Sequence, residues 1–150
     1  MAQTLVCILV HVVFSTKNRA SFIDSEIEPQ LKAYLVDLVK EYDSRCLAIN
    51  GTEDHIHLLI SQSKKHALAE IVGGIKANSS RWIKTKGERY RNFSWQDGYA
   101  AFSIGQSNVE RLKEYIANQK EHHRKKSFQE ELKKVLNLYG VEYDENLLWK

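Results

Sequence analysis

Four short segments of the chain have the apolar pattern of β-strands. Residues 4–15 are apolar on both alternations, as in a strand that is covered on both faces. Residues 45–50 and 54–61 have the pattern of two further strands, joined around an Asn-Gly pair that favours a turn. Residues 98–105 have the same character. The chain is therefore expected to contain a sheet of four strands.

A period of 3.6 residues predicts two helices between these strands. Residues 25–42 carry leucines along one side, and residues 66–85 give the clearest helical pattern of the chain. Gly73 and Gly74 should each cost about 1 kcal/mol in the middle of the second helix. That cost indicates that another group packs closely against the helix at this point.

Two more helices are predicted in the last third of the chain. Capping boxes at Ser107 and Ser127 mark their starts; the first is expected to run to about residue 124, and the second to end at Gly140. The element order is then β-α-β-β-α-β followed by two helices. It predicts a single α+β domain over residues 1–150, with a ferredoxin-like (RRM-like) antiparallel sheet. In this topology the first and third strands are the central pair.

The charge is unevenly distributed, although the net charge is only +3. Residues 64–91 contain eight Lys or Arg and two acidic residues, giving +6, and residues 111–126 contain six and two, giving +4. Two basic segments on an otherwise acidic chain favour a polyanionic partner. The isolated Cys7 and Cys46 suit a reducing cytoplasm, and we expect neither a signal peptide nor a membrane span.

The third predicted strand carries two histidines, in the stretch EDHIHLLIS. Residues two apart in a strand share a face, so His55 and His57 are expected to be neighbours on one side of the sheet. Two imidazoles on one face are a ready pair of metal ligands, although two hydrogen-bonded core histidines would give the same pattern. Asp54 is interpreted as a turn residue that points away from the pair, and His11 as a core histidine.

A tyrosine and a glutamine share the apolar face of the first C-terminal helix. Leu112, Tyr115, Ile116 and Gln119 recur at helical spacing, so burial of the leucine and isoleucine carries the polar pair toward the sheet. An amphipathic helix with a core tyrosine would have the same pattern. Tyr115 is singled out because no other tyrosine of the chain has a glutamine four positions later.

These motifs resemble those of the single-tyrosine transposases of small bacterial insertion sequences, a family of HUH nucleases that includes repeat-associated relatives. HIH matches the histidine–hydrophobic–histidine motif, and YIANQ matches the tyrosine-plus-glutamine motif. The segments HVVFSTKNR, IVGGIKANSSRWI and WQDGYAAFSIG also resemble that family and occur in the same order. The likeness covers nearly the whole chain.

The resemblance implies a transposase that cleaves and rejoins single-stranded DNA through a 5′-phosphotyrosine intermediate. Tyr115 would be the nucleophile, and the metal ligands would be His55, His57 and Gln119. Neutral nitrogen and amide ligands with open coordination positions suit Mg²⁺ or Mn²⁺ better than structural zinc. The substrate would be single-stranded DNA with hairpin-forming ends.

The resemblance also implies a homodimer with a shared active site, in which one chain supplies the histidine pair and the other the tyrosine helix. Apolar residues of the C-terminal tail would help to hold the partner: Leu147, Leu148 and Trp149. Basic residues of the two positive segments are candidate contacts to the DNA backbone: Lys76, Arg81, Lys84, Lys120, Arg124 and Lys125.

Aromatic residues at positions 82, 93 and 95 could stack on unpaired bases, although the first is better interpreted as a core residue. His122 and His123 could contact the phosphate or a metal-bound water, but they are interpreted as solvated or DNA-facing. Two alternatives stay open. One is a domesticated relative that processes repeats without moving an element. The other is a catalytically inert nucleic-acid-binding module with the same ferredoxin-like fold.

Overall fold

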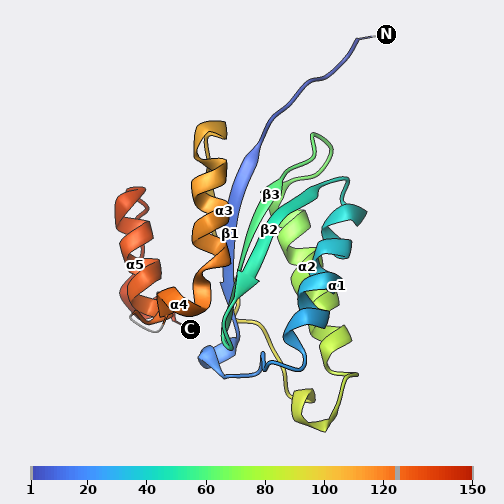
Figure 1. Cartoon of the computed structure of the whole chain (residues 1–150), viewed down its shortest axis with the longest axis vertical. Coiled ribbons are helices and arrows are strands. Elements are labelled where there is room, and N and C mark those ends of the chain that lie inside the picture. Colours follow the sequence, from blue (N-terminus) through green and yellow to red (C-terminus); the bar gives the residue numbers. More distant parts are fainter. Residues whose placement is uncertain (1, 124–125, 150) are drawn as a thin grey trace.

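The computed structural model describes residues 2–123 and 126–149, which form a four-stranded antiparallel sheet with helices on both faces (Figure 1). The strand order is β2-β3-β1-β4, so β1 and β3 are central, as predicted. The predicted α+β fold with a ferredoxin-like strand order is confirmed. The strands are β1 (Leu9–Ser15), β2 (Arg45–Gly51), β3 (His55–Ser61) and β4 (Ala100–Ser103).

The first strand is shorter than the apolar pattern predicted. β1 begins at Leu9, which pairs with Ser61 at the end of β3. The residues that precede Leu9 pair with neither β3 nor β4, and Leu5 is 78% exposed. Figure 1 shows this N-terminal segment extending away from the sheet. An apolar run therefore becomes a strand only as far as neighbouring strands can pair with it.

Two layers of helices cover the sheet. α1 (Glu28–Glu41) and α2 (Leu68–Ile83) lie on one face, and α3 (Val109–Ala117), α4 (Gln119–His123) and α5 (Phe128–Leu138) lie on the other (Figure 1). A short helix, α6 (Glu145–Leu148), follows. Strand β3 alternates between the layers: Ile56, Leu58 and Ile60 belong to the larger core cluster beneath α1 and α2. Leu59 packs with Ile116 of α3 instead, so the histidine face of β3 is the α3–α5 side.

The tyrosine helix is interrupted, which the sequence pattern did not predict. α3 ends at Ala117, Asn118 has φ −98° and ψ 21°, and α4 begins at Gln119. The Ala117 carbonyl oxygen, left free by the break, accepts a hydrogen bond of 3.0 Å from the Asn50 amide of β2. This hydrogen bond ties the end of α3 to the edge strand β2.

The two predicted capping boxes had different outcomes. The Ser107 prediction is wrong, because a 3-10 turn (Gln106–Asn108) precedes α3 and Asn108 caps it without a side-chain hydrogen bond. The Ser127 prediction is confirmed, since its hydroxyl accepts from the Glu130 backbone N–H at 3.2 Å. Gly140, at φ 66°, follows the end of α5 in the left-handed conformation typical of a helix C-terminus.

The β2–β3 connection turns two residues later than predicted. Gly51 is still part of β2, and residues 52–54 form the loop, in which Thr52 N–H donates to the His55 carbonyl at 3.1 Å. A side chain at Gly51 would overlap that carbonyl. Glycine at this position lets the hairpin close tightly against the first histidine of β3.

The glycine pair of α2 leads to a stability prediction. A Cβ at Gly74 would overlap the Tyr42 hydroxyl and ring, whereas a Cβ at Gly73 would meet no atom within 4 Å. Gly73→Ala should stabilise the protein by up to about 1 kcal/mol through helix propensity. Gly74→Ala should cost about 1–3 kcal/mol because the tyrosine must move. Urea unfolding of both variants measures the difference; equal effects would contradict the close contact.

Candidate metal and tyrosine site

His55 is fixed by its neighbours at the start of β3. Its Nδ1 lies 2.8 Å from an Asp54 carboxylate oxygen and 2.9 Å from the Thr52 hydroxyl, while Nε2 lies 3.3 Å from the amide oxygen of Gln119. A carboxylate on one ring nitrogen favours a proton there and leaves the other nitrogen as a ligand. The side of His55 that faces Gln119 is therefore the side available to a cation.

Asp54 corrects one sequence interpretation. It is a turn residue, as predicted, but its carboxylate reaches back to His55 rather than pointing away. Strand alternation does not apply to it because β3 begins only at His55. Burial raises the pKa of Asp54, but the hydrogen bonds from His55 and Thr52 and the nearby imidazoles together lower it below its ordinary value, so the carboxylate is ionised at neutral pH.

His57 is 1% exposed and lies between two other polar side chains. Its Nδ1 is 2.8 Å from His11 Nε2, and its own Nε2 is 2.8 Å from an oxygen of Glu131. Burial lowers the pKa of His57 to about 4, against the opposing effect of Glu131, and lowers that of His11 to about 3. Both imidazoles are therefore neutral at pH 7, the form in which histidine binds metals. His11 is a core histidine, as predicted, and it also contacts the site.

Glu131 is a site residue that the sequence pattern did not reveal, and His123 lies closer to the site than its preferred interpretation allowed. One ligand atom from each of His55, His57, His123 and Glu131 lies within 4.8 Å of the others. The solvated interpretation of His123 is wrong, since its side chain is 9% exposed and Nε2 lies 2.6 Å from Glu131 Oε2. His122 Nε2 is 3.2 Å from the same oxygen, but its side chain is partly exposed. Against the effect of burial, the nearby imidazoles of His123 and His57 hold the pKa of Glu131 well below its usual range.

Tyr115 and Gln119 meet the histidines within a single chain. Gln119 is fully buried, and its side-chain amide donates to the Tyr115 backbone carbonyl at 3.5 Å. The rings of Tyr115 and His57 have centroids 6.0 Å apart, and the Tyr115 hydroxyl lies 3.5 Å from His122 Nε2. Burial and the Glu131 carboxylate raise the pKa of Tyr115 above its ordinary value, so the phenol is neutral at pH 7. The two halves of the predicted site come together on the α3–α5 face.

The candidate DNA contacts are spread over both faces. Lys76, Arg81 and Lys84 belong to α2 or follow it, on the face opposite the histidines. Lys76 donates to the carbonyl oxygens of Gln96 and Gly98, whereas the other two side chains are exposed. Lys120 of α4 pairs with Glu28 and is largely exposed. The remaining two candidates, Arg124 and Lys125, lie outside the described residues.

The proposed base-stacking aromatics are mostly unavailable. Phe93 and Trp95 are buried in the α1–α2 core, so that interpretation is wrong for both. Trp82 is partly buried and stacks on Tyr34, with ring centroids 4.6 Å apart.

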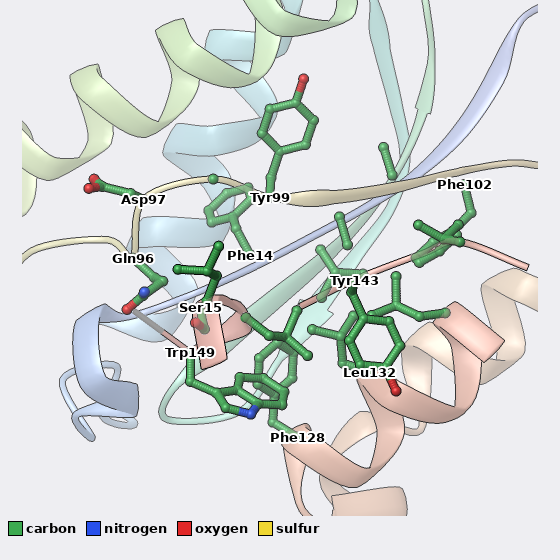
Figure 2. Close-up of a pocket in the computed structure, with 18 of the residues that line it drawn as sticks. Phe14, Ser15, Gln96, Asp97, Tyr99, Phe102, Phe128, Leu132, Tyr143 and Trp149 are labelled. Carbon is green, nitrogen blue, oxygen red and sulfur yellow. The ribbon is translucent and has the colours of Figure 1, made fainter. Parts of the chain in front are cut away.

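A different set of aromatic residues lines a pocket of about 590 Å³ next to the histidine cluster. Figure 2 shows side chains from β1, β4, α5 and the C-terminal tail turned toward it. Phe128 belongs to both regions, because it lines the pocket and stacks on His55 with ring centroids 4.4 Å apart. The tail residues Leu148 and Trp149 pack against an apolar cluster of their own chain that includes Phe128, and Arg19 lies 5.5 Å above the Trp149 ring.

Comparison with known proteins decides the family. The IS200-like transposase family matches residues 4–119. The chain belongs to this family. The matched range spans both motifs, and family membership confirms the resemblance inferred from them. Membership makes the chain a transposase, an enzyme that cleaves DNA in transposition.

Two relatives are similar to this IS200-like transposase over most of its length. The ISDra2 transposase TnpA of Deinococcus radiodurans is 22% identical over 114 residues, which cover 73% of this chain and 81% of that protein. The transposase of insertion sequence element IS200 from Salmonella typhimurium is 28% identical over 116 residues, covering 74% and 76%.

Solved structures show the same fold. A candidate transposase from Deinococcus radiodurans has a TM-score of 0.62 at 22% identity, covering 79% of this transposase and 96% of that chain. A REP-associated tyrosine transposase bound to a REP hairpin has a TM-score of 0.58 at 12% identity, covering 79% and 70%. None of the helices within the described residues is both long and apolar enough to cross a membrane.

Proposed function

We propose that this transposase cleaves and rejoins single-stranded DNA through a 5′-phosphotyrosine intermediate. Tyr115 is the nucleophile, and His55, His57 and Gln119 hold Mg²⁺ or Mn²⁺. The observation that supports this function is the convergence of the four side chains at one buried position on the sheet, from strand β3 and from the helices on either side of the Asn118 break. An inert binding module has no need of such an arrangement.

The donor atoms fit a divalent cation. His57 Nε2 is buried and makes no hydrogen bond with acceptable geometry in the part of the chain that the structure describes. His55 Nε2 and Gln119 Oε1 are 3.3 Å apart, and a carboxylate supports the far side of the His55 ring. A divalent cation held by these atoms would offset the charge of a DNA phosphate and orient it for attack.

The cleavage step exchanges one phosphate ester for another. The Tyr115 oxygen bonds to phosphorus, the bond from phosphorus to the 3′-oxygen breaks, and the released 3′-oxygen takes up a proton. The phenol proton must leave, and His122 Nε2 lies 3.5 Å from the hydroxyl. Burial lowers the pKa of His122, so its imidazole is neutral and can accept that proton. Attack by a second 3′-hydroxyl reverses the step and joins new ends.

The surroundings of the site favour a single strand as the substrate. Tyr99, Tyr143 and Trp149 line the pocket of Figure 2, and bases can stack on such rings only when they are unpaired. Arg19 lines the same pocket and can contact a phosphate. The REP-associated relative is bound to a hairpin, which supports a hairpin-containing single strand as the partner.

A cleavage assay tests the function. A labelled single strand with a hairpin end, incubated with the protein and Mn²⁺ or Mg²⁺, should give a protein–DNA band that survives a denaturing gel. A chelator should abolish the band yet leave the melting temperature nearly unchanged, because the core does not depend on an open catalytic site. The matched perfect duplex is the control and should give little adduct.

Two outcomes would count against the proposal. A full band in chelator would remove the metal from the mechanism. Tight binding of the single strand without any adduct, under all metals tried, would instead favour the inert nucleic-acid-binding module.

A further inference from the structure

A buried carboxylate lies beside the proposed metal ligands, and no sequence motif assigns it. Glu131 of α5 is 4% exposed. Its two oxygens lie 2.8 Å from His57 Nε2 and 2.6 Å from His123 Nε2. An ionised carboxylate removed from water is costly unless positive charge compensates it. The ion pairs that it makes in the described part of the chain are to the imidazoles of His57, His122 and His123.

The short contacts lack the geometry of hydrogen bonds. His57 Nε2, His123 Nε2 and Glu131 Oε2 are buried, and none of them has a hydrogen-bond partner within residues 2–123 and 126–149. The other nitrogen of His57 is already engaged, at 2.8 Å from His11. Lone pairs of nitrogen and oxygen that approach one another without a bridging proton repel, unless a cation lies between them. Such an arrangement of unpaired donor atoms is typical of ligands around an ion.

We infer that Glu131 and His123 are protein ligands of the metal held at the His55–His57 pair, and that this site takes a divalent transition ion such as Mn²⁺ in preference to Mg²⁺. The inference rests on the proposed function for the position of the metal. Three imidazoles and a carboxylate bind transition ions more strongly than Mg²⁺, which prefers oxygen ligands and retains several waters.

Metal binding would also tie α5 to the sheet. Glu131 lies one turn along α5 from Phe128, whose ring stacks on His55. A metal–Glu131 bond would therefore add to an existing contact between α5 and β3. Slower hydrogen exchange in α5 on addition of Mn²⁺ is the structural consequence.

Calorimetric titration of the full chain with MnCl₂, without DNA, tests the inference. Wild type should bind Mn²⁺ at least about tenfold more tightly than Glu131→Gln, and at least about tenfold more tightly than it binds Mg²⁺. Glu130→Gln is the matched control, because it alters an exposed carboxylate of the same helix, and it should bind like wild type. His123→Gln should also weaken Mn²⁺ binding. It provides the test if Glu131→Gln does not fold.

The outcomes separate this inference from the proposed function. Equal Mn²⁺ affinity in wild type, Glu131→Gln and His123→Gln would overturn the inference and leave the DNA-cleavage proposal untouched. Tighter binding by Glu131→Gln would also overturn it, because the carboxylate would then be excluding the metal. Equal affinity for Mg²⁺ and Mn²⁺ would overturn the stated metal preference. Absence of Mn²⁺ and Mg²⁺ binding by wild type would remove the metal from the proposed function as well.

Discussion

Replacing Tyr115 with phenylalanine is expected to abolish the covalent protein–DNA band, a loss of about 10³-fold or more, because the attacking oxygen is gone. The substitution leaves the ring in its half-buried position beside His57 and removes no positive charge. The fold and the affinity for single-stranded DNA should therefore be unchanged. A denaturing gel measures the adduct, and fluorescence anisotropy measures binding in the same samples.

Tyr139→Phe is the matched control for this experiment. Tyr139 is an exposed tyrosine at the end of α5, and its substitution should leave the adduct at the wild-type level. If the band persists with Tyr115→Phe, another residue forms the covalent bond and the nucleophile assignment is wrong. If binding is lost together with cleavage, the hydroxyl contributes to recognition and the loss of the band no longer identifies a nucleophile.

The fold followed from the sequence because the apolar pattern of each element shows which of its faces must be buried. A slip of one residue in β3 would move Ile56, Leu58 and Ile60 out of the α1–α2 core and put the histidines in their place. The alternation of the strand therefore fixes which face carries the histidines. The position of Tyr115 and Gln119 beside the sheet was predicted in the same way, because Ile116, which lies between them in the sequence, had to be buried.

The sequence pattern did not identify Glu131 as a site residue. In α5 the apolar positions Phe128, Leu132 and Leu136 define a buried face, and Glu131 lies on it, three residues after the first and next to the second. A charged residue on an apolar face was the signal that could have found it. Its partners could not be read from the sequence, because they come from β3 and α4 and meet it only in the folded chain.

The break at Asn118 was unpredictable for a different reason. Helix propensity differs by less than about 1 kcal/mol between most residues, so tertiary contacts decide whether a helix continues. Here the Ala117 carbonyl finds a donor in Asn50 of β2, a contact between residues far apart in the sequence. The connection that can act as a hinge for Tyr115 is an earlier one, residues 105–108, because it precedes α3 and can send that helix to its own sheet or to a partner's.

We propose that the protein is a homodimer whose sites are completed in trans, and complementation is expected to reveal it. His57→Ala and Tyr115→Phe proteins should each be inactive. After subunit exchange, half of the dimers in an equal mixture carry one variant of each kind, and each of these has one intact site. About a quarter of the wild-type sites should then be restored. The adduct band measures the recovery, and unmixed variants are the controls.

The structure supplies the competing expectation, because in one chain Tyr115 already lies beside its own His57 and α3 packs on its own β2 and β3. If that cis arrangement is the working one, every chain in the mixture carries one broken component and no activity returns. Exchange to the trans arrangement would have to release the contact between Asn50 and Ala117. Weakening that contact with Asn50→Ala should then speed recovery in the mixture if the site is shared, and should change nothing if it is not. Monomers that cleave at the wild-type rate would reject the shared site outright.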